Sequence, residues 1–231
     1  MHVLRPAFRM EDEEALDFAS SRGFGLLVAA GEGGPIASHV PFVIARRGEQ
    51  VVAGLHLTAR NPLAELADGE RRFLLAVSGA DSYVSNDWYE SPDQISTWLY
   101  EAVHLTGPAA RRDRAANRGH GDSLLETFED RLAPKPSWSL ATMEERKRET
   151  MLAAIVTIEM EVERVEGQRK LNQHKLDEDH VAVADRLARS DDAASREIAG
   201  KLRALRPHLV YAPDAPDTKH PEAASVRTYR W

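Results

Sequence analysis

The stretch from Ile95 to His104 reads ISTWLYEAVH. Its β-branched and aromatic residues are typical of a pleated, half-buried strand, and the pattern continues to Thr106. Trp98 and His104 are six residues apart, so a regular strand places them on the same face. This segment therefore predicts a β-strand that presents a flat aromatic ring and an imidazole on one side of a sheet.

Further strands are predicted on both sides of this segment. Short apolar runs bounded by turn residues, and strict alternation of apolar and polar residues, are the two signals. The turn Arg46–Glu49 joins two of these runs as a hairpin. The predicted strands are Phe24–Ala30, Pro35–Ala45, Gln50–Thr58, Arg72–Ser78 and residues 156–162.

Helices are predicted between and after the strands, without a regular β-α-β alternation. They cover Met10–Ser21, a short turn from Asn61 through Ala67, Gly121–Leu132, Met143–Met151, Asp177–Arg189 and Ala193–Leu205. This order favours a mostly β protein of the α+β class, with an antiparallel barrel or curved sheet and peripheral helices. We expect a single domain over residues 1–206 and an irregular C-terminal tail over residues 207–231, which is rich in proline and polar residues.

The composition excludes several kinds of protein. The 231 residues are 42% hydrophobic and include no cysteine, which rules out disulfides, thiol catalysis and cysteine-based zinc sites and fits a cytoplasmic location. The formal net charge of −7 argues against direct DNA binding through bulk electrostatics. No apolar run is long enough to span a bilayer. The sequence also carries no phosphate-binding glycine loop, GxSxG elbow or HExxH motif, so no catalytic residue and no metal site is predicted.

The segment His56–Pro62 ends a predicted strand and starts a helix, with Asn61 as N-cap and Pro62 in the first turn. Backbone N–H groups at a helix N-terminus attract phosphate, and Thr58 and Arg60 would complete such a site. The alternative is a capped helix with a solvated arginine.

The segment Glu166–Lys175 reads EGQRKLNQHK. We expect Lys170 and Gln173 to follow a glycine turn at Gly167, where a lysine suits a phosphate and a glutamine suits the edge of a heterocycle. Thr97 and Trp98 would face the ring of the same ligand. The alternative for each of these residues is a purely structural role, either in the hydrophobic core or in an exposed loop. A haem or small-ligand site on His39, His56 or His104 stays open.

At these residues the sequence resembles the FMN-binding negative transcriptional regulators, the PaiB-like family. The family blocks Tyr-Ile-Ser-Pro-x-Trp-Tyr, Pro-Thr-Trp-Asn-Tyr-x-x-Val-His and Gly-Lys-x-Lys-Leu-Ser-Gln-Asn are similar to residues 83–89, 96–104 and 167–174. Residues 38–42 and 56–62 resemble two weaker blocks. The order of the blocks is the same, over about residues 1–190.

The resemblance implies a split β-barrel of the FMN-binding and pyridoxamine-oxidase-like kind, and a homodimer with FMN at the subunit interface. It implies that Thr58, Arg60 and Lys170 lie at the phosphate, and that Thr97, Trp98, His104 and Gln173 lie at the ring and ribityl chain. His56 and Asn61 belong to the same implied cofactor site.

The chain departs from the family pattern at several of these positions. They are Ala59, with Arg60 next to it, Ser96, Leu99, Gln168, Asn172 and His174. A shift by one residue on a strand turns a side chain to the other face, which predicts reduced FMN affinity, another ligand or no ligand. Two functions follow from the resemblance: a dimeric FMN-binding regulator, or a flavin-dependent oxidoreductase that uses a nicotinamide donor.

Overall fold

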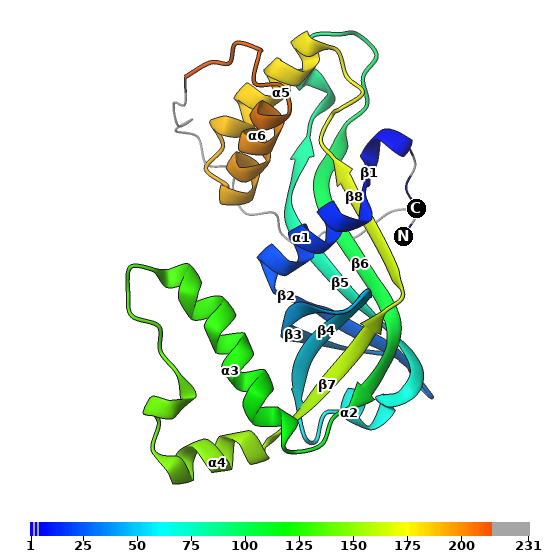
Figure 1. Cartoon of the computed structure of the whole chain (residues 1–231). Helices are drawn as coiled ribbons and strands as arrows, with labels where there is room; N and C mark the ends of the chain where they lie inside the picture. The colour runs from blue at the N-terminus through cyan, green and yellow to red at the C-terminus, as the bar shows by residue number, and fades with distance from the viewer. Residues whose placement is uncertain (2, 4, 214–231) are drawn as a thin grey trace, which may run out of the picture. The chain divides into compact units, whose positions relative to one another are not determined.

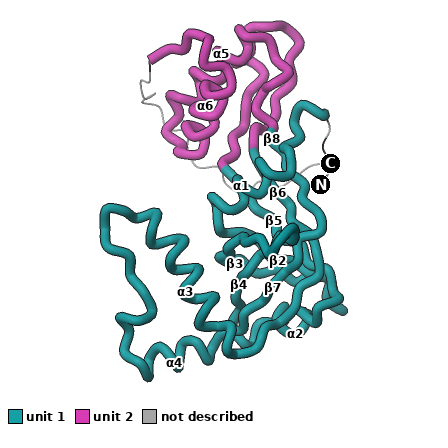
Figure 2. The backbone as a smooth tube through the Cα atoms, viewed as in Figure 1, with its two compact units in different colours: residues 1–79, 101–169 teal, residues 80–100, 170–231 magenta. Residues whose placement is uncertain are grey.

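The structure is a computed structural model that describes residues 1, 3 and 5–213. It divides into two compact units (Figure 2): unit 1 comprises residues 1–79 and 101–169, and unit 2 comprises residues 80–100 and the chain from residue 170 onward. Whether the two units fold together as the single domain expected over residues 1–206 stays a prediction. Of the predicted irregular tail, residues 207–213 have no regular helix or strand, and the remainder lies outside the described residues.

Six strands form a closed barrel (Figure 1). They are β2 (Phe24–Gly31), β3 (Gly34–Arg47), β4 (Gln50–Thr58), β5 (Asp68–Val84), β6 (Thr97–Arg111) and β7 (Ile155–Val162). Their order is β6-β5-β2-β3-β4-β7, and an additional β6–β7 pairing, which includes Ala109 with Met160, joins the two ends. The predicted antiparallel barrel with peripheral helices is therefore confirmed.

Gly107 allows β6 and β7 to meet where the barrel closes. A Cβ atom on Gly107 would lie 1.6 Å from the backbone oxygen of Glu161, so no other residue fits without moving the strands. Glu163 N donates to Thr106 O at 3.0 Å beside this point. The barrel closes because the sequence supplies a residue without a side chain at its tightest crossing.

The predicted glycine turn at Gly167 is wrong. Gly167 lies within strand β8 (Arg164–Lys170), which pairs with the two-residue strand β1 (Arg9–Met10) and lies next to β6. A Cβ on Gly167 would lie 2.7 Å from Met10 Cβ and 2.8 Å from Ala15 Cβ. The glycine serves close packing rather than chain reversal, and Lys170 ends the strand.

The helices of unit 1 lie outside the barrel (Figure 1). Helix α1 (Asp12–Arg22) ends at Gly23, as predicted, and α2 (Pro62–Leu66) is capped by Asn61, whose Oδ1 accepts from Leu63 N at 3.0 Å. Helices α3 (Ala116–Glu129) and α4 (Glu145–Ala153) lie in the connection from β6 to β7 and project to one side of the barrel. Short 3₁₀ turns occupy Pro6–Phe8, Asp130–Leu132 and Leu140–Thr142.

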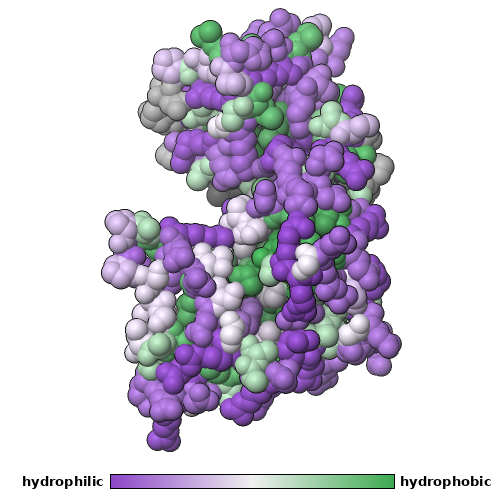
Figure 3. Space-filling model, in the orientation of Figure 1, coloured by the Kyte–Doolittle hydropathy of each residue, from purple (hydrophilic) through white to green (hydrophobic). Residues whose placement is uncertain are grey.

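Each unit has its own hydrophobic core. The barrel interior holds fully buried side chains such as Phe42, Phe73 and Leu105. In unit 2 the core lies between the ends of β5 and β6 and two helices, α5 (Asp177–Ala188) and α6 (Ala193–Leu205), as predicted. The 3₁₀ turn Asn86–Trp88 leads out of β5. Hydrophobic side chains appear on the surface in small groups among hydrophilic ones (Figure 3).

Candidate functional site

The predicted site residues fall into two groups by unit. Unit 1 holds His56, Thr58, Arg60, Asn61 and His104, whereas unit 2 holds Thr97, Trp98, Lys170 and Gln173.

In unit 2 the structure brings Lys170 and Thr97 together, although they are far apart in the sequence. Lys170 Nζ donates to Thr97 Oγ1 at 2.5 Å, and both side chains are half-buried. Strand β8 ends at Lys170 and β6 begins at Thr97, so the two strand ends meet in one place. The two motifs that the sequence analysis singled out are therefore neighbours.

A second lysine and a glutamine belong to the same place. Lys175 Nζ donates to Gln94 Oε1 and lies 4.6 Å from the centre of the Tyr89 ring. Burial, and next the charge of Lys175, lower the pKa of Lys170. The two ammonium groups are therefore close enough to repel each other.

This lysine pair has no acidic partner among the residues that the structure describes. Within the described part of the chain, no carboxylate oxygen lies within 4.0 Å of either ammonium group; a hydroxyl and an amide oxygen take that place. Two cations held together by neutral oxygens leave excess positive charge, which suits a phosphate or another anion.

Asn172 shapes the loop that carries these residues. It has φ +58, a left-handed conformation that asparagine tolerates better than most residues, and is 1% exposed. Its Oδ1 accepts from Tyr89 Oη at 3.5 Å, while its buried Nδ2 has no hydrogen-bond partner among the described residues. The family serine at this position is thus replaced by a side chain that fixes the turn between Lys170 and Gln173.

Gln173 is held by its own loop and by helix α6. Its Oε1 accepts from Leu171 N at 2.8 Å, which turns the amide oxygen toward the backbone. Arg206, just after α6, donates to Gln173 O at 3.1 Å and to Lys175 O at 2.9 Å. Helix α6 therefore fixes the loop from residue 171 to residue 175.

Trp98 offers an exposed flat surface in the same unit. It is 53% exposed and packs edge-on against Tyr83, with ring centroids 5.9 Å apart. Trp98 is therefore not a core residue. Together with Tyr83 it forms an exposed aromatic pair on which the flat ring of a ligand can pack. Leu99, which replaces the family asparagine, is fully buried and cannot contact a ligand.

In unit 1 His56 contacts a residue that the sequence analysis did not select. His56 Nδ1, on β4, lies 3.1 Å from His120 Nε2, on α3. Burial lowers the pKa of His56; burial, and then the charge of His56, lower the pKa of His120 to about 4. One ring donates and the other accepts, so at least one of them is neutral.

Two of the predicted phosphate-binding side chains in the segment after His56 are exposed to solvent. Thr58 and Arg60 are exposed, whereas Asn61 Nδ2 donates to Ser38 Oγ at 2.8 Å in addition to capping α2. His104 is half-buried on β6, and burial lowers its pKa. His39 is exposed and stacks on Phe24 with ring centroids 6.1 Å apart.

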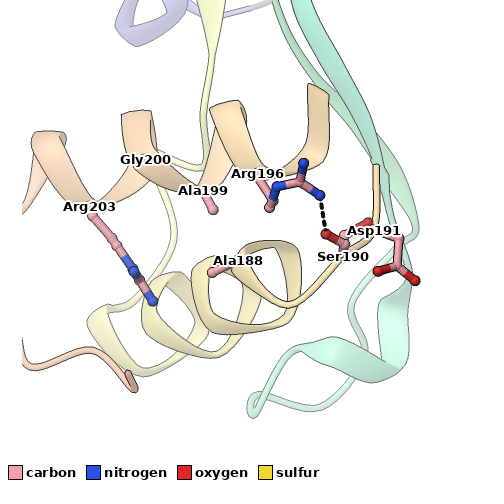
Figure 4. Close-up of a pocket in the computed structure, with 7 residues that line it drawn as sticks. All are labelled: Ala188, Ser190, Asp191, Arg196, Ala199, Gly200 and Arg203. Atoms are coloured by element: carbon pink, nitrogen blue, oxygen red, sulfur yellow. Dashed lines mark hydrogen bonds between the residues drawn. The ribbon is translucent and has the colours of Figure 1, made fainter. Parts of the chain in front are cut away.

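Among the residues that the structure describes, no group of three or more His, Asp or Glu side chains is arranged to hold a metal. A cavity of about 270 Å³ lies between the end of α5 and α6 (Figure 4), lined by Ala188, Ser190, Asp191, Arg196, Ala199, Gly200 and Arg203. Arg196 in it already donates to Ser190 O at 2.8 Å, and none of the predicted site residues lines it.

Sequence reasoning missed Gln94, Lys175, Arg206 and His120. Lys175 stood in the quoted segment, and its charge was the available signal. The contacts of Gln94, Arg206 and His120 depend on folding across long stretches of chain, and no local pattern marks them. No helix in the described residues is both long and apolar enough to cross a membrane.

A closed antiparallel barrel with β8 and β1 beside β6 defines the class of split β-barrel proteins. The chain belongs to the family described as "Putative FMN-binding domain", whose model matches residues 1–164. It is 25% identical over 187 residues to protease synthase and sporulation protein PAI 2 of Bacillus subtilis, covering 81% of this chain and 89% of that protein.

Two solved structures share the fold. The FAD and haem binding protein from Mycobacterium smegmatis is 20% identical, with a TM-score of 0.50 and coverage of 69% of this chain and 71% of its own. The flavocytochrome Anf3 from Azotobacter vinelandii is 16% identical, with a TM-score of 0.51 over 98% of this chain and 92% of its own. The resemblance to the PaiB-like family and the split-barrel fold that it implied are thus confirmed.

Proposed function

We propose that this protein binds FMN, with the phosphate at the Lys170–Lys175 pair. The observation that carries the proposal is a pair of half-buried lysines without an acidic partner among the described residues, in which Lys170 contacts Thr97 and Lys175 contacts Gln94. A phosphate would supply the missing negative charge, and Thr97 would donate its hydroxyl hydrogen once Lys170 turns to the anion. Membership of the family and the similarity to PAI 2 support a flavin as the ligand.

The flat part of the ligand suits the exposed aromatic pair. Trp98 and Tyr83 offer ring surface, and the position of Gln173 near the edge of the heterocycle is proposed from the resemblance. A bound flavin supplies redox chemistry, and the protein supplies binding and orientation. The residues of unit 1, namely His56, Thr58, Arg60, Asn61 and His104, are proposed as the further contacts.

We further propose that the protein acts as a homodimer with FMN at the subunit interface, in the cytoplasm, as a regulator of the PaiB type. In a dimer the two groups of residues are free to come from different chains. The exposed Trp98 and Ile95, which are 53% and 80% exposed, are apolar surface that a second copy would cover. The formal charge of −7 favours regulation without direct DNA contact.

The test is an absorbance spectrum of the purified protein after addition of FMN and removal of the excess by gel filtration. We expect a retained flavin spectrum in the wild type and its loss in Lys170→Ala. Oxidation of NAD(P)H by the loaded protein would add the oxidoreductase function, and a haem band after addition of haem would point to the haem alternative. A wild-type protein that retains no FMN would overturn the proposal.

A further inference from the structure

The contact between His56 and His120 joins a candidate site residue to a helix outside the barrel. The two ring nitrogens are 3.1 Å apart, and the rings meet edge-on at 65°. At this distance the nitrogens share one proton, because two protonated rings would place two cations in contact. The contact therefore couples the tautomers of the two rings, because one of the two nitrogens must carry the proton and the other must be free to accept it.

His120 is held in place by its neighbour Asn117. Asn117 Nδ2 donates to Leu152 O and Ile155 O, each at 2.9 Å, and its Oδ1 accepts from Thr157 N at 3.1 Å. Thr157 pairs with His56 across β4 and β7. The start of α3 is thus fixed to the strand that faces His56, and His120 has a defined position relative to that ring.

The charged groups of the surrounding elements are largely paired with one another. Arg118 and Asp122 on α3 form an ion pair at 2.9 Å, and Arg47 of β3 pairs with Glu159 of β7 at 3.2 Å. Arg148 of α4 donates to Met143 O. Burial and the partner ring are what shift the pKa of His120, so the two histidines titrate as a unit.

We propose that His120 is a positioning residue for His56: it holds Nδ1 of His56 toward α3, directs Nε2 to the ligand side, and releases the ring when both imidazoles are protonated. This inference rests on the proposed function for the role of His56 in ligand binding. The tautomer itself is a property of the protein without ligand.

The direction of the pH effect follows from the depressed pKa values. A histidine whose folded pKa lies below the ordinary value of 6.5 stabilises the neutral, docked state fully above about pH 6.5. That contribution is lost as the pH falls toward about 4, where the folded pair takes up its second proton. Docking of α3 on β4, and the orientation of His56, should therefore weaken in this window.

The first experiment observes His56 directly, by NMR of ¹⁵N-labelled imidazoles in the protein without ligand. We expect one tautomer of His56 in the wild type and two separated protonation steps for the pair. His120→Gln keeps a polar atom near the Nε2 position, so His56 should keep its tautomer and show a single protonation step. His120→Phe removes that polar atom, so His56 should show a mixture of tautomers. His208→Gln, at an exposed position, is the control.

The second experiment measures FMN affinity from about pH 7.5 to pH 4 for the same variants. The ratio of wild-type to His120→Gln affinity should fall roughly tenfold as the pH approaches about 4, where the folded pair takes up its second proton, while titration of FMN itself cancels in the ratio. An unchanged His56 tautomer in folded His120→Phe would overturn the inference. A wild type that binds no FMN at any pH would overturn the proposed function alone, because the NMR result still decides the role of His120.

Discussion

Arg169 and Lys170 are consecutive residues of β8, yet they have opposite surroundings. Arg169 donates to Glu101, which is 2% exposed, at 2.6 Å and also to Glu14, so its charge is neutralised inside unit 1. Lys170, in unit 2, contacts Thr97 and lies near a second lysine, and it forms no ion pair among the described residues. Successive side chains of a strand point to opposite faces, so one strand end supports both a closed ion pair and an open cationic site. The residue type alone does not distinguish a structural cation from one that is available to a ligand. The distinction comes from whether acidic side chains lie next to it.

The largest effect is expected from Arg169→Ala. This change leaves Glu101 buried without its cation and should lower the free energy of unfolding by about 3–5 kcal/mol, measured by urea denaturation. Arg72→Ala is the matched control, because its pair with Glu163 is exposed and should cost less than about 1 kcal/mol. Equal losses for the two variants would contradict the structural role of Arg169.

Lys170→Ala should have the opposite effect to Arg169→Ala: it should weaken FMN binding and leave the stability of the fold nearly unchanged. It removes a charged phosphate partner, so the FMN dissociation constant should rise by a factor equivalent to about 1.5–3 kcal/mol, while the free energy of unfolding changes little. Fluorescence titration of FMN checks the affinity, with Lys201→Ala on α6 as control. If Lys170→Ala loses stability but not affinity, the contrast with Arg169 disappears.

The pH dependence of binding sharpens the contrast further. The lowered pKa of Lys170 means that it loses its proton below the ordinary lysine value of 10.5, so FMN affinity should fall with rising pH earlier than for an ordinary lysine. Lys175→Gln removes the like charge and should move this fall to higher pH. Titrations from about pH 8 to pH 11 test the shift, and an unmoved profile would mean that the two ammonium groups do not interact.

Arg60→Ala should have the smallest effect, below about 1 kcal/mol in FMN binding, because Arg60 is exposed to solvent that screens its charge. The same titration measures it. A loss larger than that of Lys170→Ala would place the phosphate at the start of α2 instead.

The barrel was predictable because alternating and β-branched residues mark its strands locally. Strand β8 was not, since EGQRK carries a glycine and charges that read as a loop; only the packing of Gly167 against Met10 and Ala15 explains a strand there. Within the candidate site, the resemblance implied one cofactor site for Thr97 and Lys170 but put them at opposite ends of the ligand, so their direct contact was not predicted. The His56–His120 contact had no such signal, because an isolated histidine in a helix does not identify its partner.

The closing pair of the barrel has a consequence for how the chain tolerates change. β6 and β7 pair directly, Arg111 with Ile158, so everything from residue 112 to residue 154 is the loop of an elaborated hairpin. The entropic cost of closing a loop rises by only about 0.6 kcal/mol for each doubling of its length, so loop closure by itself sets no tight limit on the size of this segment. Replacing α3 and α4 by a short turn would keep the β6–β7 pairing that closes the barrel, but it would also remove His120. Within this architecture, control over His56 is a separable module that can be gained or lost without rebuilding the barrel.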